Sequence, residues 1–336
     1  MNKHLSLNFW DEPGWIDQAR AWIDIQVGQL GLVRTGPLEQ PHQRPWSTVF
    51  TIPTSAGILY FKAAAPSLAH EAALTQILAE WFPGCVPAPL ASDFDRGWML
   101  LPEHGPPKGQ RLRELVRTED SPNRWFDILA SYAGLQITLS SRLNELLGLR
   151  VPDRRLERLP ELYGNLLFNE EFLLRDQPDG LDPEMIEQLH HRLPDLAGRC
   201  QELAAGPIPE SLNHGDFHDG NIFVQGDHFW FFDWGDASIT HPFFSMRTVF
   251  VSLEISLGWP EGSPKVNPLR DAYLKPWTAL APLTELREVF TLSQRLAPII
   301  SALSWFRVVS RTPADLRGDS IYAVPGLLQE FLGLNP

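Results

Sequence analysis

The chain has 336 residues, of which 28 are Lys or Arg and 41 are Asp or Glu, so its formal charge is −13. This acidity argues against a nucleic-acid binder and against binding at an anionic membrane surface, because both require clustered cations. Apolar content of 43% is typical of a packed globular chain. Its two cysteines, Cys85 and Cys200, suit a reducing compartment, and residues 1–10 lack a signal-peptide core. We therefore expect a cytoplasmic enzyme or small-molecule binder.

The first hundred residues are expected to form one helix followed by strands. Apolar residues at helical spacing predict the first helix over residues 11–30. A second helix is expected over residues 67–81, with Ser67 as its N-cap. The expected strands are residues 32–38, 47–52, 58–63, 86–91 and 97–101.

Beyond residue 103 the chain becomes mostly helical. Residues 102–109 are rich in Pro and Gly and are expected to form a linker. The expected helices are residues 123–147, 156–176, 183–205 and several from about 243 onward, with a short β hairpin at 222–224 and 229–232. The pattern predicts an α+β, bilobal fold with a small β-rich N-lobe over residues 1–103 and a larger helical C-lobe over residues 104–336.

The most informative segments are residues 212–224 and 231–236. Phosphoryl transfer needs a carboxylate that accepts the proton of the attacking hydroxyl, oxygen ligands for Mg²⁺, and a cation for the phosphates that are not transferred. Asp216 and Asn221 have the spacing of the base and the metal-binding amide in the kinase catalytic loop. Asp233 follows an apolar strand and begins Asp-Trp-Gly, in place of the kinase Asp-Phe-Gly. A hairpin between the two motifs would bring Asn221 and Asp233 together around Mg²⁺.

These two motifs resemble a known family signature. The sequence His-Gly-Asp-Phe-His-Asp-Gly-Asn at residues 214–221, with Asp-Trp-Gly-Asp at 233–236, is similar to that of the aminoglycoside phosphotransferase and choline kinase family. The resemblance covers most of the chain, since the order of the lobes also fits. It implies a protein-kinase-like fold, ATP as donor, Mg²⁺ as cofactor, and a small-molecule alcohol as acceptor.

The resemblance also implies roles for individual residues. Asp216 would be the catalytic base, and Asn221 and Asp233 would be the Mg²⁺ ligands. His218 would brace the loop or the metal site, and Asp236 would support Asp233. For His218 and Asp236, a hydrogen bond that fixes the loop is the alternative to a direct part in the chemistry.

The N-lobe should supply a strand lysine that steadies the α- and β-phosphates. Lys62 is one of five lysines and ends the apolar run 58–62, and Glu71, nine residues later, is its natural partner. A lysine that snorkels from an edge strand is the alternative. The resemblance further implies that adenine binds the backbone of Leu101 and Glu103, at the hinge after the last N-lobe strand.

The expected phosphate loop departs from the family pattern. It should lie between the first two strands, over residues 39–47, where the chain has two prolines and no glycine. Glycines normally let backbone N–H groups approach a phosphate closely. Side chains of Arg44, Ser47 or Thr48 are therefore the alternative phosphate contacts.

The acceptor site is expected near the insertion at residues 153–210, which carries 13 Asp and Glu against 6 Arg. An acidic wall would suit a cationic acceptor such as an amino sugar or amino alcohol, and a solvated helix face and loop is the alternative. The densest acidic group is Glu170, Glu171, Asp176, Asp179 and Asp182. Tryptophans that could either line the pocket or pack in the core are Trp234, Trp259, Trp277 and Trp305.

Two rival functions remain open from the sequence. One is a metal-dependent hydrolase, with a zinc or two-metal cluster drawn from His214, Asp216, His218, Asp219, Asp233 and His241. The other is a pseudokinase that binds nucleotide without transfer, which the glycine-free loop favours and the intact Asp216, Asn221 and Asp233 oppose. A protein kinase is less favoured, because no Ala-Pro-Glu motif closes an activation segment.

Overall fold

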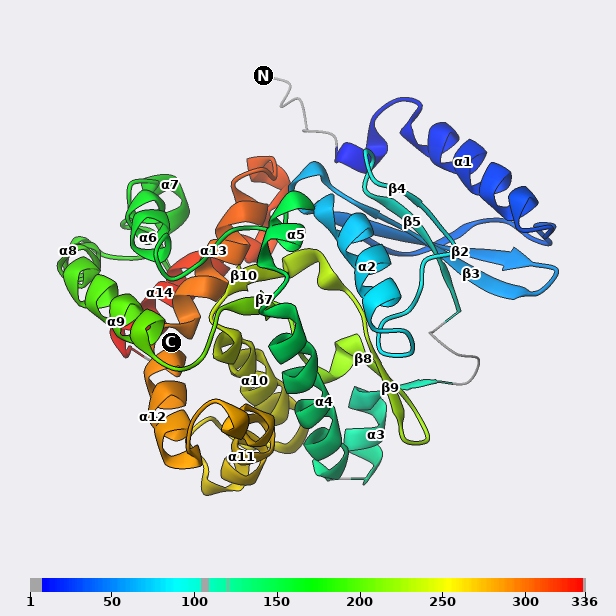
Figure 1. The fold of residues 1–336 in the computed structure, drawn as a ribbon. Coiled ribbons are helices and arrows are strands. Elements are labelled where there is room, and N and C mark those ends of the chain that lie inside the picture. Colours follow the sequence, from blue (N-terminus) through cyan, green and yellow to red (C-terminus); the bar gives the residue numbers. More distant parts are fainter. Residues whose placement is uncertain (1–7, 104–108, 120, 335–336) are drawn as a thin grey trace, which may run out of the picture. The chain divides into compact units, whose positions relative to one another are not determined.

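The computed structural model describes residues 8–103, 109–119 and 121–334 of the chain (Figure 1). These residues form two compact units. Unit 1 consists of residues up to Gln110 together with Phe223–Gly235 and Val308–Gly318, and unit 2 consists of Arg111–Ile222, Asp236–Arg307 and the residues from Asp319 onward. A division after residue 103 stays a prediction, because residues 104–108 of the expected linker lie outside the described residues.

Unit 1 contains a five-stranded antiparallel sheet with the strand order β1-β2-β3-β5-β4. The elements are α1 (Trp15–Gln29), β1 (Glu39–Arg44), β2 (Ser47–Thr54), β3 (Gly57–Ala64), α2 (His70–Trp81), β4 (Ala91–Asp93) and β5 (Trp98–Pro102). A second hairpin, formed by β8 (Ile222–Gln225) and β9 (His228–Phe231), comes from much later in the chain and supplies nearly all of its residues to the same unit.

The two faces of this sheet have different environments. Phe61 and Ala63 on β3 pack in an apolar core with Ile23 and Val27 of α1. Lys62 lies between Phe61 and Ala63, so it points to the opposite face, since successive strand residues alternate. The α1 side of the sheet is therefore structural, and the α2 side carries the charged residue.

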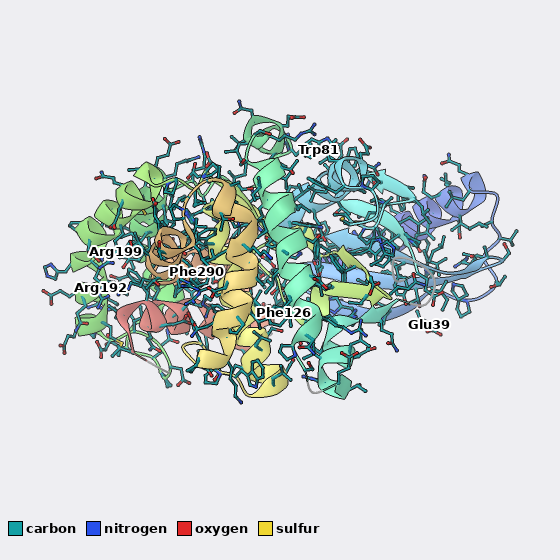
Figure 2. All side chains as sticks on the ribbon, turned by 60° about the horizontal axis from the view of Figure 1, so that its bottom comes forward. Glu39, Trp81, Phe126, Arg192, Arg199 and Phe290 are labelled. Carbon is teal, nitrogen blue, oxygen red and sulfur yellow. The ribbon has the colours of Figure 1, made fainter. Side chains whose placement is uncertain are left out.

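Three predictions in unit 1 are wrong, one of a loop and two of strands. Residues 39–44, expected as part of a phosphate loop, form β1, and Pro45 and Trp46 alone make the turn to β2. Every residue of β1 is exposed, including Glu39 at its start, so no alternation of apolar and polar residues marked it as a strand (Figure 2). The runs 32–38 and 86–91 form no strand, apart from single bridges at Arg34 and Val86 and the first residue of β4.

Unit 2 is mostly helical. Its elements are α3 (Leu112–Glu119), α4 (Asn123–Leu139), α5 (Leu143–Gly148), α6 (Leu159–Leu167), α7 (Glu170–Leu173), α8 (Pro183–His191), α9 (Leu193–Ala205), α10 (Met246–Leu257), α11 (Asn267–Leu274), α12 (Leu283–Gln294), α13 (Ala297–Val309, whose last two residues belong to unit 1) and α14 (Ala323–Leu332). A two-stranded sheet of β7 (Ser211–Asn213) and β10 (Ser238–Thr240) flanks the segment that carries Asp216, and β6 (Gln110–Arg111) precedes α3. The α+β architecture, with a small β-rich unit and a larger helical one, is confirmed.

The expected long helices of unit 2 are each divided in two. The helix expected over 123–147 breaks between α4 and α5, where the hydroxyls of Ser140 and Ser141 bond back to the carbonyls of Ile137 and Thr138. The helix expected over 183–205 breaks before α9, where Pro194 has no N–H to continue a helical ladder. In the described part of the chain, no helix is both long enough and apolar enough to cross a membrane.

Candidate active site

The first group of predicted residues meets in unit 1 and is here called the lysine cluster: Lys62, Glu71 and Asp233. The Lys62 Nζ lies 2.6 Å from Glu71 Oε1 and 2.6 Å from Asp233 Oδ1. Burial alone disfavours the ammonium, but the two carboxylates outweigh it and raise the pKa of Lys62. Lys62 is therefore a fixed cation, and the alternative of a snorkelling edge lysine is not what the geometry shows.

Local structure explains how these three residues meet. Lys62 points to the α2 side of β3, and Glu71 lies in the first turn of α2. Asp233 follows β9, which is tied into unit 1 by a hydrogen bond from the Phe231 N–H to the Cys85 carbonyl. Asp233 has a positive φ of 69°, a conformation that Asp and Asn tolerate better than most residues. Its strained backbone aims the carboxylate at Lys62.

The second group lies in unit 2, on the segment from residue 214 to residue 221, here called the catalytic loop. The Asn221 Nδ2 donates to both the backbone carbonyl and Oδ2 of Asp216, each at 3.0 Å. These two bonds use the amide's N–H groups and leave Asn221 Oδ1 as its acceptor. Asp216 and Asn221, five residues apart, are thus in direct contact, which the sequence analysis did not predict.

His218 is held between Asp216 and a residue that the sequence did not suggest. Its Nδ1 accepts from the Gly220 N–H at 2.9 Å and lies 3.2 Å from Nη2 of Arg113, on α3. Both neighbours are donors, so Nδ1 carries no proton and Nε2 carries it. The Nε2 lies 3.3 Å from Asp216 Oδ2, so its N–H is close to that oxygen. A Cβ at Gly220 would approach His218 Cε1 to 2.6 Å, so this arrangement requires glycine.

Asp219, beside His218, is buried and fully engaged. Its Oδ1 accepts from Arg113 Nε at 2.7 Å, and its Oδ2 accepts from the Ser256 hydroxyl at 2.6 Å. Its backbone N–H donates to the Ser252 hydroxyl at 3.2 Å. With 1% of its side chain exposed, Asp219 neutralises Arg113 and fastens the catalytic loop to α10.

A buried polar network fixes the start of the catalytic loop. The Tyr132 hydroxyl, on α4, accepts from the His214 N–H at 3.0 Å, and its ring stacks on Phe217 at 3.9 Å between centroids. The side-chain Oδ1 of Asn213 accepts from the Gly215 N–H and from the Ser245 hydroxyl. Each of these buried polar groups has a partner, so the loop is held in one conformation.

Asp236, predicted as a supporting residue, packs against the same loop. A Cβ at Gly215, where φ is +81°, would lie 2.2 Å from the Asp236 carbonyl oxygen. The Asp236 carboxylate lies 3.9 Å from Arg307. Nearby Arg154 is buried, and burial together with Arg307 lowers its pKa to about 9. Asp236 thus lies near one buried guanidinium, that of Arg154, and one partly buried guanidinium, that of Arg307, within unit 2.

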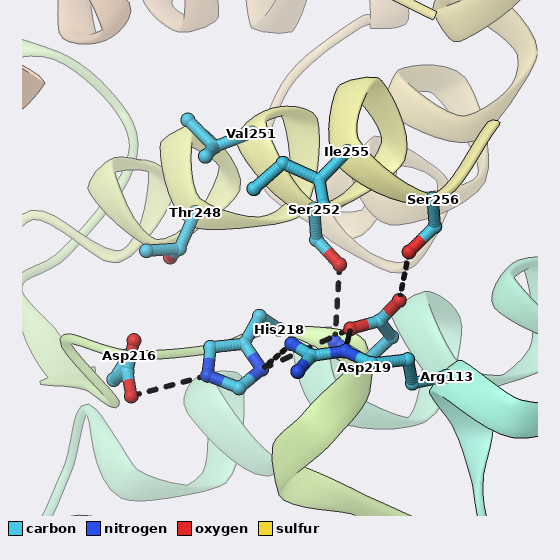
Figure 3. Close-up of a pocket in the computed structure, with 9 residues that line it drawn as sticks. All are labelled: Arg113, Asp216, His218, Asp219, Thr248, Val251, Ser252, Ile255 and Ser256. Carbon is cyan, nitrogen blue, oxygen red and sulfur yellow. Dashed lines mark hydrogen bonds and ion pairs between the residues drawn. The ribbon is translucent and has the colours of Figure 1, made fainter. Parts of the chain in front are cut away.

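A cavity of about 120 Å³ opens beside Asp216, entirely within unit 2 (Figure 3). One wall is the catalytic loop with Arg113, and the other is one face of α10. Nine described residues line the cavity: Arg113, Asp216, His218, Asp219, Thr248, Val251, Ser252, Ile255 and Ser256. None of the dense acidic group of residues 170–182 is among these nine, and none of the four tryptophans is.

The remaining predicted residues make contacts with their own neighbours in the fold. Leu101 pairs with Tyr60 across β5 and β3, and Glu103 is exposed one residue beyond β5. Of the suggested phosphate contacts, Thr48 is buried and its hydroxyl donates to the His42 carbonyl within the β1–β2 hairpin. Two members of the acidic group have local partners. Arg175 lies 3.2 Å from Glu170, and Asp182 caps α8.

The cluster expected by the hydrolase alternative is not assembled in the part of the chain that the structure describes. No group of three or more His, Cys, Asp or Glu there is placed to hold a metal ion. His241 is buried, which lowers its pKa to about 3, and its Nδ1 accepts from the Phe243 N–H. His241 is thus a neutral capping residue of the segment that follows β10.

The family model that describes the phosphotransferase enzyme family matches residues 44–245, more than half of the chain. The chain belongs to this family. It is therefore a phosphotransferase, and the expected enzyme class, with an alcohol group as acceptor, is confirmed. A search of curated proteins found no significant match.

Solved structures show the fold. A choline/ethanolamine kinase family protein from Mesorhizobium loti is 18% identical, with a TM-score of 0.60, over 95% of this chain and 94% of that chain. The gentamicin complex of APH(2")-IIa is 16% identical, with a TM-score of 0.59, over 97% of both chains. The choline kinase LicA from Streptococcus pneumoniae is 12% identical, with a TM-score of 0.58, over 94% and 99%. The protein-kinase-like fold and the expected family resemblance are confirmed.

Proposed function

We propose that this phosphotransferase is an ATP- and Mg²⁺-dependent small-molecule kinase that transfers the γ-phosphoryl group to a hydroxyl. The observation that carries the proposal is the lysine cluster, in which one partly buried ammonium bonds two carboxylates at 2.6 Å each. Such a cation can steady the α- and β-phosphates of a nucleotide, with Glu71 holding it in place. Leu101 and Glu103 are the proposed backbone contacts for adenine. The two free cysteines are consistent with a cytoplasmic enzyme.

The side chains suit Mg²⁺, which prefers oxygen ligands and is usually held by one or two protein groups together with phosphates. Asn221 has its Oδ1 available once its N–H groups bond Asp216, and Asp233 offers a carboxylate that is 45% exposed. Asn221 and Asp233 are thus the proposed Mg²⁺ ligands, with Asp236 in support. A bound Mg²⁺ would supply charge neutralisation on the phosphate oxygens.

Asp216 is the proposed catalytic base, and its two oxygens have different surroundings. Oδ2 accepts from Asn221 Nδ2 at 3.0 Å and lies 3.3 Å from His218 Nε2, whereas among the described residues Oδ1 receives no hydrogen bond. Oδ1 is therefore the oxygen that would accept the proton of the acceptor hydroxyl as it attacks the γ-phosphorus. His218 and Asn221 orient the carboxylate by holding Oδ2.

The neighbouring structures support the choice of donor and the size of the acceptor. One is named as a ternary complex of streptomycin, ATP and APH(2")-IIa, and others are named for choline and ethanolamine kinases. We infer from them that ATP is the donor here and that the acceptor is a small molecule, neither nucleic acid nor membrane. An amino sugar or amino alcohol is the acceptor class that these names suggest.

The proposal is tested by Mg·ATP turnover. Purified enzyme is incubated with Mg·ATP and a panel of amino alcohols, amino sugars and neutral alcohols, and ADP release and acceptor phosphorylation are measured. Nucleotide binding that requires Mg²⁺, with phosphorylation of at least one acceptor, is expected. Nucleotide binding with no transfer to any acceptor or to water would instead identify a pseudokinase. Tight stoichiometric zinc in the purified protein would favour the hydrolase.

A further inference from the structure

We propose that the acceptor is an uncharged alcohol with a short aliphatic body, rather than a cationic amino sugar or amino alcohol. This inference rests on the proposed function, because it assumes that Asp216 is the base and that the cavity beside it receives the acceptor. It is carried by the charges and surfaces of the nine residues that line this cavity (Figure 3).

Among the described residues that line the cavity, none offers an unpaired charge to a cation besides the base itself. Two carboxylates line it, those of Asp216 and Asp219. Asp219 is 1% exposed and already pairs with Arg113 at 2.7 Å, so its charge is neutralised. A cationic acceptor would have to pair with Asp216, the group that must take the proton of the hydroxyl. A charge placed in such a site without its own partner is unfavourable.

Where no carboxylate is available, aromatic rings can bind a quaternary ammonium. None of the nine described lining residues is Trp, Tyr or Phe. Cation–π binding needs the face of Trp, Tyr or Phe within about 6 Å. Among the nine described lining residues the one ring is the imidazole of His218, whose neighbour Arg113 is itself a cation. An anionic acceptor is disfavoured as well, because Asp216 would repel it and Arg113 is paired.

The α10 wall presents an apolar surface. Thr248, Val251, Ser252, Ile255 and Ser256 follow the spacing of one helix face (Figure 3). Two hydroxyls of this wall donate elsewhere, because Thr248 donates to the Ser245 carbonyl and Ser256 donates to Asp219, and Ser252, which accepts from the Asp219 N–H, is buried. Val251 and Ile255 are 39% and 67% exposed, so their aliphatic surface is what the wall offers.

The size of the cavity limits the acceptor's body. An engineered cavity of about 150 Å³ in another protein holds benzene, so 120 Å³ suits a branched group of about five heavy atoms. Burying such a group against Val251 and Ile255 removes apolar area from water on both partners. A hydroxyl at one end of the molecule would then reach Asp216, while the aliphatic end contacts α10.

The test compares two acceptors of the same shape. Choline carries a trimethylammonium group, and 3,3-dimethylbutan-1-ol carries a tert-butyl group in its place. For both, kcat/KM is measured by ADP release, and the dissociation constant is measured by saturation-transfer NMR on the full chain without nucleotide. The neutral alcohol is expected to be favoured at least about tenfold in both measurements, because it loses no charge solvation.

Two variants test whether the preference for the neutral alcohol over choline depends on α10. Ile255→Asp places a carboxylate on the exposed apolar wall and is expected to shift the ratio of the two acceptors about tenfold toward choline. Ile25→Asp, at an isoleucine on α1 that is 57% exposed, controls for the added charge and should leave the ratio unchanged.

The outcomes separate this inference from the proposed function. If choline is preferred or equal in the wild-type protein, or if Ile255→Asp leaves the ratio unchanged, the acceptor class is wrong even though transfer occurs. If neither molecule binds, the acceptor class is also overturned. If the neutral alcohol binds tenfold tighter but neither it nor any other acceptor is phosphorylated, the inference about the cavity holds and the proposed kinase activity fails.

Discussion

The lysine cluster of unit 1 and the catalytic loop of unit 2 hold their carboxylates by different means. Asp233 and Glu71 are held by charge, each directly against the Lys62 ammonium. Asp216 accepts from the neutral amide of Asn221 and lies 3.3 Å from His218 Nε2, and Arg113, which contacts the other nitrogen of His218, is paired with Asp219. The first arrangement places two carboxylates directly against one ammonium, and the second holds a carboxylate with no cation in direct contact among the described residues.

The difference matches what each site must do under the proposed function. Groups that bind a polyphosphate and its metal work best when their charges are fixed. A general base must keep its affinity for a proton, which a direct cation would reduce. Indirect contact through His218 orients Asp216 without placing a full positive charge on it. Each of the following predictions alters one side of this comparison.

The largest effect is expected from Asp216→Asn. The amide has the shape of the carboxylate but cannot accept the hydroxyl proton, so kcat should fall about 10²–10⁴-fold. The dissociation constant for Mg·ATP, measured by isothermal titration calorimetry, should stay within a few-fold of wild type. Activity close to wild type would show that Asp216 is not the base.

Asp233→Asn should act on nucleotide binding instead. Asn tolerates the positive φ of residue 233, so the change removes the charge while keeping the backbone. We expect the dissociation constant for Mg·ATP to rise by at least about tenfold, because a metal ligand and a partner of Lys62 are both weakened. Asp227→Ala, at an exposed residue in the β8–β9 turn, is the matched control. Equal affinities in the two variants would contradict the assignment.

His241 predicts a dependence of stability on pH. Burial lowers the pKa of His241 to about 3 from 6.5, so below pH 6.5 the unfolded chain binds a proton that the folded chain does not. Stability present above pH 6.5 is therefore lost as the pH falls, by about 2 kcal/mol at pH 5. His241→Asn keeps an acceptor for the Phe243 N–H, and should remove this part of the pH dependence of urea unfolding.

A surface histidine provides the control for that experiment. His191 lies on α8 with 78% of its side chain exposed. His191→Asn should leave the difference between the unfolding free energies at pH 7 and pH 5 as it is in the wild type. A wild-type slope that persists in His241→Asn would show that other groups cause it.

The smallest effect is expected from His218, which positions the base. His218→Ala removes the imidazole whose Nε2 lies 3.3 Å from Asp216 Oδ2, so kcat should fall about five- to tenfold with the KM for ATP unchanged. His218→Gln, whose amide can donate to Asp216, should recover part of the loss. A purely structural role would instead lower the midpoint of thermal unfolding equally in both variants, without this difference in kcat.

The sequence predicted contacts that depend on short spacings. Lys62 and Glu71 are nine residues apart on a strand and the following helix, and this pair was predicted; Asp216 and Asn221 are five apart on one loop, and their place in one motif was predicted but not their contact. The bond from Lys62 to Asp233 spans 171 residues and the one from Arg113 to Asp219 spans 106. No local pattern encodes such contacts, because they depend on how separate elements pack.

Some helices and strands could also not be predicted from the local sequence. α1 was predicted because its apolar face repeats at helical period, whereas β1 was missed because both of its faces are exposed. α10 was foreseen only as helix within a long C-terminal stretch. That its exposed Val251 and Ile255 lie beside Asp216 follows from tertiary structure, and the sequence-based search for an acceptor site turned instead to the acidic residues 170–182.

The polar network under the catalytic loop has a consequence for how the enzyme gains activity during folding. Gln136 on α4 donates to the Leu212 carbonyl and accepts from the Tyr273 hydroxyl, contacts that span 76 and 137 residues. Contacts between such distant parts of a chain form slowly, because large loops must close first. We therefore expect catalytic activity to return late in refolding, after the helical signal in circular dichroism has recovered.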